Sequence, residues 1–442
     1  MSVRRILGLS AFFHDSAAAY VEDGRVVAAA QEERFTRRKQ DPSFPANATR
    51  YCLDQAGIRV DELDAVVFYE RPDLKFARLV TTYLAFAPRG WESFQRAAPE
   101  WLSGKRRLDR ILLRELGTLG LGELDPSKLR FAEHHVSHAA SAYYPSPFED
   151  AAVLTVDGVG EWATTTAALG RGGELTMLKE LRFPHSVGLL YAAFTSYTGF
   201  RVNSGEYKVM GLAPFGEPKY AQLIYDHLVE LEPDGSLRLN QEYFDYCTGI
   251  SMTSDRFHDL FGGPPREPET LLRQRDMDLA ASVQVVTDEI LLRMTRALAD
   301  ETGERRLCLA GGVALNCVTN GKILRDGRFD EIWIQPAAGD AGGAVGAALL
   351  GYHLLGGQQR RVADGLDGMA GTYLGPEFTQ DEIESRLAAA GARCETLADD
   401  AILEATTDAL VDGQAVGWFQ GRMEFGPRAL GNRSILGDPR SR

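Results

Sequence analysis

The stretch Val153-Leu154-Thr155-Val156-Asp157-Gly158 is an apolar run that ends in a turn signal. It predicts a buried strand, and a predicted hairpin follows over residues 164–169 and 175–181, around a glycine-rich turn at 170–173. The same order of strand, turn and hairpin occurs 147 positions earlier, counted from Leu7 to Leu154, in residues 6–9, 17–21 and 26–30. A repeat at this distance predicts two related α/β halves rather than a solenoid.

The composition excludes several classes of protein. The chain of 442 residues is too long for one small core, so we expect two or more packed units. Its 48 basic and 62 acidic side chains give a net charge of −14, which argues against a general nucleic-acid binder. A local basic pocket remains compatible with this charge, and Arg34, Arg37, Arg38 and Lys39 form one candidate cluster.

Cysteine usage and the N-terminus indicate a cytoplasmic protein. The five cysteines are scattered and lack CxxC spacing, which is typical of a reducing compartment and argues against a zinc ribbon. His14 and Asp15 interrupt the short apolar run near the N-terminus, and no small-residue cleavage site follows. We therefore expect no signal peptide and no membrane partner.

The chain divides into three parts. Residues 1–355 contain both predicted halves, with a helical insert at about 73–128 and a long amphipathic helix over 279–298. The segment 356–375 has six glycines and little periodicity, so we predict a linker. Residues 376–442 begin with an acidic helix and are short for an independent domain, which usually has roughly 50–250 residues.

Three of the eight histidines lie within five residues. On a helix, His134 and His138 share one face, and Asp157 follows a predicted strand 19 residues later. Asp340, in a glycine-rich turn after another predicted strand, is a candidate second carboxylate. Two imidazoles and carboxylates with open positions suit iron, manganese or zinc, so we predict a metal site. The alternative is a pair of hydrogen-bonded histidines at a packing surface. His135 is expected to be structural or to support a metal ligand through a hydrogen bond.

Glycine-rich turns follow the predicted strands 307–310 and 331–335. Gly311-Gly312 ends the first strand, and residues 339–343 end the second, about 30 positions later. Glycine lets the backbone approach a nucleotide closely, and its N–H group can face a phosphate. A single such turn indicates only a tight bend, whereas two of them in a duplicated fold indicate nucleotide binding.

Other polar side chains are candidate contacts near these turns. Glu206 and Lys208 lie between apolar flanks and are candidates for binding a ribose or a leaving group, although a charged surface loop is the alternative. His14 follows the first predicted strand. The first-strand turns of two duplicated halves face one cleft, so His14 is a candidate acid, base or substrate contact.

The segment 421–434 carries three arginines, Arg422, Arg428 and Arg433, among glycines and a proline. Guanidinium groups bind phosphates or carboxylates in a bidentate manner. Apolar residues within this stretch predict that it is buried, which argues against a solvated basic turn.

In their order and number, these motifs resemble those of the O-carbamoyltransferases of the nodulation-protein and antibiotic-biosynthesis type, over nearly the whole chain. The segments that carry the resemblance are 12–18, 32–39, 134–139, 203–216, 310–316 and 421–434. The resemblance implies a duplicated first domain of the actin, sugar-kinase and Hsp70 class, whose two halves are RNase H-like. This domain would be similar to relatives of the tRNA threonylcarbamoyl-transfer ATPases. It implies a smaller α+β C-terminal domain similar to threonylcarbamoyl-adenylate synthases.

The resemblance also implies a two-step, ATP-dependent reaction. The C-terminal domain forms carbamoyl-adenylate from carbamoyl phosphate and ATP, and the first domain transfers the carbamoyl group to a hydroxyl of a sugar or natural product, as in antibiotic biosynthesis. By position, it implies Fe²⁺, with Mn²⁺ or Zn²⁺ as alternatives, held by His134, His138, Asp157 and Asp340. It implies catalytic contacts for His14 and Lys39, adenylate or carbamoyl contacts for Glu206, Gly311, Gly312 and Asn316, and phosphate contacts for Arg422, Arg428 and Arg433.

Family members continue well past the final motif, so we expect an incomplete C-terminal domain that transfers from preformed adenylate but does not make it. One alternative is a tRNA threonylcarbamoyltransferase, against which the acidic charge and the segment 421–434 argue. A kinase or ATPase of the same class would need no histidine pair, and a non-catalytic nucleotide-binding protein is the third alternative. The acceptor, the metal and the oligomeric state stay open, a homodimer being one option.

Overall fold

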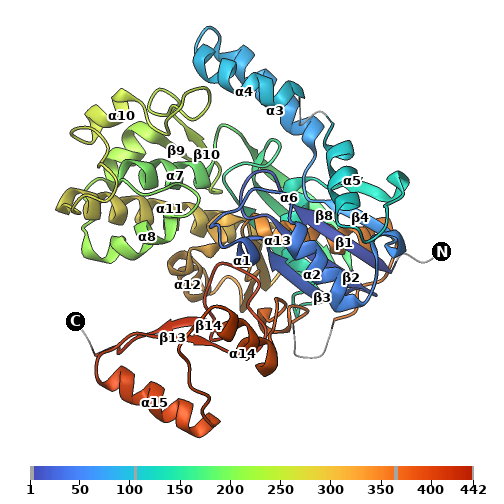
Figure 1. Ribbon diagram of the computed structural model, residues 1–442. Coiled ribbons are helices and arrows are strands. Elements are labelled where there is room, and N and C mark those ends of the chain that lie inside the picture. The colour runs from blue at the N-terminus through green and yellow to red at the C-terminus, as the bar shows by residue number, and fades with distance from the viewer. Residues whose placement is uncertain (1–3, 104–106, 363–366, 441–442) are drawn as a thin grey trace.

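The structure, a computed structural model, describes residues 4–103, 107–362 and 367–440. Two five-stranded mixed sheets form its two lobes (Figure 1). The strand order is β3-β2-β1-β4-β5 in the first lobe and β8-β7-β6-β11-β12 in the second. In each sheet, a central strand has an antiparallel hairpin on one side and two parallel strands on the other. This shared topology confirms the predicted α/β duplication.

The predicted strands and both hairpins are present. The first sheet contains β1 (Arg5–Ser10), β2 (Ala17–Glu22), β3 (Arg25–Gln31), β4 (Ala65–Phe68) and β5 (Leu129–Phe131). The second contains β6 (Ala151–Val156), β7 (Ala163–Arg171), β8 (Glu174–Arg182), β11 (Arg306–Ala310) and β12 (Glu331–Ile334). Asp23 and Gly24 connect β2 to β3 with φ values of 49° and 81°, as a two-residue hairpin turn requires. The strands β4 and β5 were not predicted.

Two helices are exchanged between the lobes. Helix α6 (His134–Tyr143) follows the last strand of the first sheet but packs on the second sheet, against β6, β7 and β11. Helix α13 (Asp340–Leu350) follows the last strand of the second sheet but packs on the first, against β1, β2 and β4. The two helices also pack against each other. Because both begin beyond the carboxyl ends of parallel strands, their first residues, His134 and Asp340, meet between the lobes.

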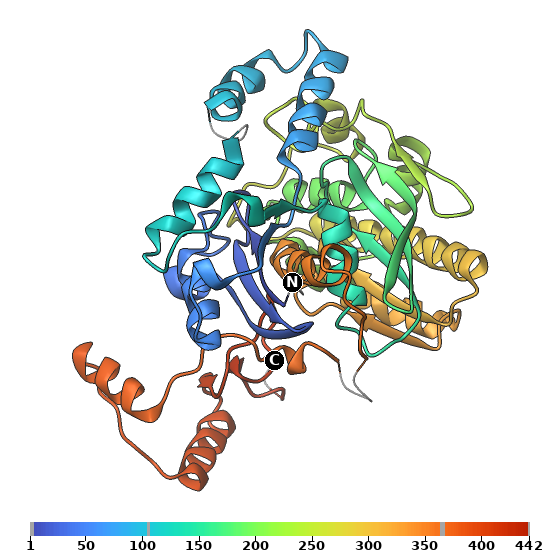
Figure 2. The same ribbon diagram turned by 90° about the vertical axis from the view of Figure 1, so that its right-hand side faces the viewer.

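Further helices cover the two sheets. In the first lobe they are α1 (Glu33–Thr36), α2 (Ala46–Ala56), α3 (Pro72–Phe86), α4 (Trp91–Ser103) and α5 (Leu108–Thr118). The last three occupy the segment predicted to be helical, and α3 and α4 extend away from the sheets (Figures 1 and 2). Within the described ranges, no helix combines the length and the hydropathy that crossing a bilayer requires.

The second lobe has a larger helical layer and its own apolar core. Its elements are α7 (Val187–Tyr197), α8 (Glu206–Leu212), α9 (Ala221–Leu223), β9 (Val229–Leu231), β10 (Leu237–Leu239), α10 (Asp255–Leu260), α11 (Gln274–Thr302) and α12 (Cys317–Asp326). Leu279, Val283, Val286 and Ile290 of α11 are all fully buried, as their helical spacing predicted.

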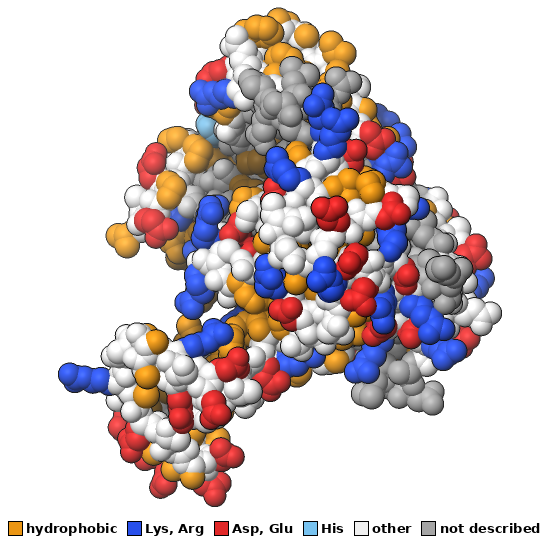
Figure 3. All heavy atoms as spheres, turned by 45° about the vertical axis from the view of Figure 1, so that its right-hand side comes forward, with side chains coloured by type: hydrophobic (Ala, Val, Ile, Leu, Met, Phe, Trp, Pro, Cys, Tyr) orange, Lys and Arg blue, Asp and Glu red, His pale blue; other side chains and the backbone are white. Residues whose placement is uncertain are grey.

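The C-terminal segment contacts the two lobes at one end only. It contains α14 (Gln380–Ala389), α15 (Asp399–Val411), β13 (Val416–Phe419) and β14 (Arg433–Leu436). No side chain of α14 or α15 is buried, and the segment stands apart with acidic side chains on its surface (Figures 2 and 3). Part of the predicted linker nevertheless packs on the first lobe, because Met369 and Leu374 are buried and Ala29 donates a backbone hydrogen bond to Leu374.

Candidate metal centre

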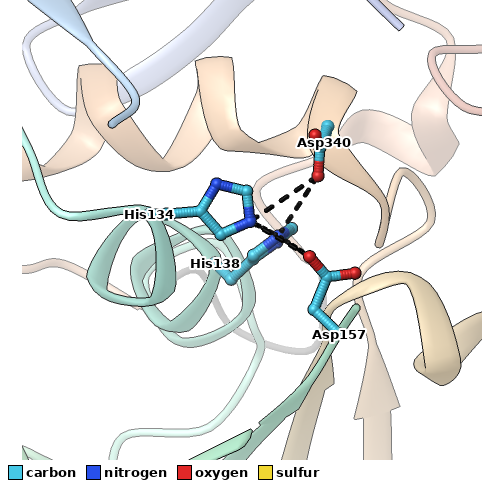
Figure 4. A group of neighbouring side chains, drawn as sticks. All are labelled: His134, His138, Asp157 and Asp340. Atoms are coloured by element: carbon cyan, nitrogen blue, oxygen red, sulfur yellow. Dashed lines mark hydrogen bonds and ion pairs between the residues drawn. The ribbon is translucent and has the colours of Figure 1, made fainter. Parts of the chain in front are cut away.

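Four predicted ligands converge between the lobes. His134 and His138 lie one turn apart on α6, Asp157 follows β6, and Asp340 is the first residue of α13 (Figure 4). The two Nε2 atoms are 3.0 Å apart, and Oδ2 of Asp157 lies 3.1 Å from Nε2 of His134 and 3.7 Å from Nε2 of His138. Oδ1 of Asp340 lies 3.6 and 3.7 Å from the same nitrogens. One ligand atom from each side chain lies within 4.8 Å of all the others.

This arrangement fits a divalent cation. A cation about 2.0–2.2 Å from each ligand atom holds neighbouring ligand atoms roughly 3.0–3.5 Å apart, close to the shorter distances between these side chains. Two imidazoles and two carboxylates supply nitrogen and oxygen ligands and a charge of −2. A dry interior tolerates that charge only when positive charge compensates it. The donor set suits iron, manganese or zinc alike.

The charges of the four side chains depend on one another. Burial alone would raise the pKa of Asp340, but His14, His134 and His138 lower it to about 2. The pKa of Asp157 is also held well below its usual range, against burial, by His134 and His138. Burial lowers the pKa of His138, but the two aspartates raise it to about 9. Both carboxylates are therefore ionised, as ligands of a cation must be, whereas His138 has to lose its proton before its Nε2 can bind a cation.

Neighbouring groups orient the ligands. The N–H of Gly312 donates to Oδ1 of Asp157 at 3.0 Å, leaving Oδ2 to face the histidines. Glu161, a buried residue that sequence reasoning missed, accepts hydrogen bonds from the backbone N–H of His134 at 3.0 Å and of Arg71 at 2.6 Å. Its carboxylate lies where the N-terminal dipole of α6 favours negative charge. No spacing pattern in the sequence marks this residue.

His135 forms hydrogen bonds within the second lobe. Its Nδ1 is 2.9 Å from the hydroxyl of Thr155 on β6, away from the four-residue cluster. Burial, followed by the charges of His134 and His138, holds its pKa well below the usual range, so His135 is neutral.

A cavity of about 690 Å³ adjoins the cluster. Of the residues predicted to bind substrate or nucleotide, those that line it are His14, Lys39, Glu206, Gly312, Asn316 and Arg428. Apolar side chains such as Leu189 and Val313 form other parts of the wall. The cavity therefore joins a charged end at the cluster to an apolar region, as nucleotide sites commonly do.

His14 lies between the cluster and the cavity. Its Nε2 is 3.6 Å from Oδ2 of Asp340, and its Nδ1 is 3.0 Å from Oδ2 of Asp15. Burial lowers the pKa of His14, but the negative charge of Asp340 and the hydrogen bond with Asp15 raise it to about 9. Asp15 is a second residue that the sequence did not single out, although it lies inside the segment 12–18.

Two predicted nucleotide contacts lie elsewhere. Lys208 is exposed, with its Nζ 5.8 Å from the ring centroid of Phe200, because residues two apart on α8 face different sides and Glu206 takes the cavity side. The backbone of Gly311 packs directly against the backbone of Val156. A Cβ atom at Gly311 would lie 2.2 Å from the carbonyl oxygen of Val156, so this position has no room for a side chain. Asn316 lines the cavity, but its side chain caps α12 by accepting from the N–H of Thr319.

The three predicted phosphate arginines take separate positions. Arg428 lines the cavity, with its guanidinium 5.6 Å from the ring centroid of Tyr207. Arg422 instead binds the hydroxyl of Tyr51 at 2.9 Å and the carbonyl of Leu374 at 2.7 Å, so it fastens the C-terminal segment to the first lobe. Arg433 lies 4.0 Å from the buried carboxylate of Glu424. Of the three arginines, only Arg428 lines this cavity, so a phosphate site shared by all three stays a prediction.

Two family models together match most of the chain. A family model described as "Carbamoyltransferase N-terminus" matches residues 5–349, and one described as "Carbamoyltransferase C-terminus" matches residues 407–442. An uncharacterized protein of Synechocystis is 58% identical over 99% of this chain and 71% of its own length. Nodulation protein NolNO of Sinorhizobium fredii is 38% identical over 97% of this chain and 59% of its own length. The chain thus spans only about six to seven tenths of these relatives.

Among solved structures, HypF of T. kodakarensis is similar to this chain, with 14% identity and a TM-score of 0.37 over 80% of this chain and 49% of that chain. This similarity is too weak to bear on function.

Proposed function

Since the chain belongs to the carbamoyltransferase family, we propose that it is an O-carbamoyltransferase that uses carbamoyl-adenylate, formed from carbamoyl phosphate and ATP, to carbamoylate a hydroxyl of a sugar or natural product. The observation that carries the proposal is the buried cluster of two histidines and two aspartates at the end of the 690 Å³ cavity. A cavity of that size accommodates a nucleotide with its attached group.

In this proposal, His134, His138, Asp157 and Asp340 hold a divalent cation. When bound, such a cation neutralises phosphate charge and polarises the carbamoyl carbonyl. The acceptor oxygen forms a bond to the carbamoyl carbon, the bond from that carbon to the phosphate oxygen breaks, and AMP leaves with the electron pair. The Gly312 N–H keeps Asp157 oriented toward the histidines throughout.

His14 is the proposed base for the acceptor hydroxyl. Its Nδ1 is held by Asp15 at 3.0 Å, so Nε2 remains to take the proton, and the Asp15 carboxylate stabilises the imidazolium that forms. The charge of Asp340 contributes to the raised pKa of His14, so engagement of Asp340 as a ligand brings that pKa back toward the range of a working base. Lys39, on the same wall, is the proposed contact to a carbamoyl or phosphate oxygen.

The proposal is tested by supplying carbamoyl-adenylate to the purified protein, with water as the surrogate acceptor. AMP release above the protein-free rate is measured before and after treatment with a chelator. We expect chelation to stop AMP release, and Fe²⁺, Mn²⁺ or Zn²⁺ to restore it. AMP release that is indifferent to the chelator would contradict the proposal. With labelled threonylcarbamoyl-adenylate as the donor instead, label recovered on added tRNA would favour the threonylcarbamoyltransferase alternative.

Arg428 offers a second test, because it faces the transfer cavity. We expect Arg428→Ala to lower the rate of transfer from supplied carbamoyl-adenylate about tenfold to a hundredfold, the loss typical of a hydrogen bond to a charged group. Arg422→Ala is the matched control: it removes hydrogen bonds that fasten the C-terminal segment, so it should lower the melting temperature and leave transfer by the folded protein intact. Unchanged transfer in Arg428→Ala would remove this residue from the site.

A further inference from the structure

A second cavity, of about 470 Å³, continues from the first beyond His14. Residues of both lobes line it: Phe13, His14, Arg38, Lys39, Gln40, Asp41, Pro42, Arg201, Val202 and Asn203. Six of these residues also line the larger cavity, so the two spaces meet at His14 and Lys39. We call this space the basic subsite.

The basic subsite carries positive charge on a protein whose net charge is −14. Arg38, Lys39 and Arg201 are its basic residues, and Asp41 is its one acidic residue. The Lys39 ammonium pairs with Glu33 at 2.9 Å, and Asp41 accepts the backbone N–H of Ser43 at 3.0 Å. Neither Arg38 nor Arg201 forms a salt bridge with a residue in the described ranges, although Arg38 contributes to the lowered pKa of Asp41. Two guanidinium groups therefore remain available to a ligand.

The backbone around the basic subsite is strained. Nine non-glycine residues in the described ranges have positive φ, and five of them line or flank this space: Phe12, Asp15, Arg37, Gln40 and Asn203. Such residues persist only where the surroundings hold them, and they cluster at ligand sites. Here the side chain of Gln40 donates to the carbonyl of Asn203 at 2.6 Å, across the two lobes, and Phe12 donates its N–H to Pro42 at 2.9 Å. Each lobe therefore forms one wall of the subsite, and these hydrogen bonds hold the walls in place.

We propose that the basic subsite binds an anionic group of the acceptor, a phosphate or a carboxylate, through Arg38 and Arg201. Guanidinium groups recognise both kinds of anion through paired hydrogen bonds. An acceptor held in this way extends from the subsite toward His14, which places a hydroxyl beside the proposed base and opposite the cluster. The adenylate takes the larger cavity, along Gly312 and Asn316. This inference rests on the proposed function and names the class of its acceptor.

The test measures, by calorimetry and both with and without AMP, the binding of glucose 6-phosphate, glucuronate and glucose to the full chain. Inorganic phosphate is the smallest probe. We expect at least one of the two anionic sugars to bind at least about tenfold more tightly than glucose, because a hydrogen bond to a charged group contributes roughly a factor of ten or more. The preferred sugar distinguishes a phosphate from a carboxylate. The double variant Arg38→Gln/Arg201→Gln should lose the preference, with an unchanged melting temperature as the check on folding.

Arg37→Gln is the matched control, because Arg37 is an exposed arginine of the same loop that does not line the subsite, and it should retain the preference. Three results would each overturn the inference: no preference for the anionic sugars, a preference that survives in the double variant, or displacement of the anionic sugar by AMP, which would assign the arginines to the nucleotide. Since binding is measured without turnover, this result is independent of the chelator test of carbamoyl transfer.

Discussion

Replacing His138 by alanine is expected to remove the metal from the protein and to lower carbamoyl transfer at least about a thousandfold. Its Nε2 lies within 3.7 Å of a ligand atom of each of the other three side chains, so it is central to the cluster. Without it, the buried carboxylate of Asp340 and the half-buried carboxylate of Asp157 face a single imidazole. Metal content is measured by elemental analysis of the purified variant, and transfer by AMP release from carbamoyl-adenylate.

His227→Ala is the control for this experiment. His227 is exposed in the second lobe and lies outside both cavities, so its removal should change neither the metal content nor the rate. A fully metallated and active His138→Ala protein would show that the imidazole is not a ligand, and that the histidines are a packing pair instead.

Gly346→Ala is expected to lower the free energy of unfolding by about 3 kcal/mol, the upper end of the usual cost of overpacking, and to lower the metal content as well. A Cβ atom at this position of α13 would lie 1.8 Å from the carbonyl oxygen of Ser137 and 3.0 Å from the backbone nitrogen of Ser141, both on α6. Backbone atoms cannot rotate away, so the two helices must separate. Because α6 carries both histidines and α13 carries Asp340, their separation moves the ligands apart. Urea unfolding and elemental analysis measure the two effects.

Gly117→Ala makes the same chemical change in α5 with the opposite expected sign. A Cβ atom there meets nothing within 4 Å, and alanine is favoured over glycine in a helix by up to about 1 kcal/mol. Equal stability of the two variants would mean that α6 and α13 are not packed closely enough to fix the ligands.

The duplicated core could be predicted because it is encoded locally. Both central strands, β1 and β6, are apolar runs followed by a hairpin, and the same order occurs twice. The strands β4 and β5 lie outside the repeated order of strand, turn and hairpin, so the repeat did not mark them, and β5 has only 3 residues. The exchange of α6 and α13 between the sheets depends on contacts between distant parts of the chain, which no local pattern reports.

The convergence of His134, His138, Asp157 and Asp340 could be predicted for a similar reason. Helical spacing puts His134 and His138 on one face of α6. Asp157 directly follows β6, so its side chain lies at the carboxyl end of that strand. Glu161 was missed because it acts on a backbone N–H group of α6, which leaves no mark in the sequence. The position of Arg428 depends on how the segment 421–434 packs against both lobes, so the sequence could indicate its chemistry but not its cavity.

The most direct test of the account is a crystal structure of the protein grown with Mn²⁺ or Fe²⁺, with anomalous scattering measured at the absorption edge of the metal. We expect one strong anomalous peak, about 2.0–2.4 Å from Nε2 of His134, Nε2 of His138 and an oxygen of each aspartate. Density without such a peak, in which the imidazoles donate hydrogen bonds directly to Asp157 and Asp340, would contradict the metal centre and the transfer mechanism built on it.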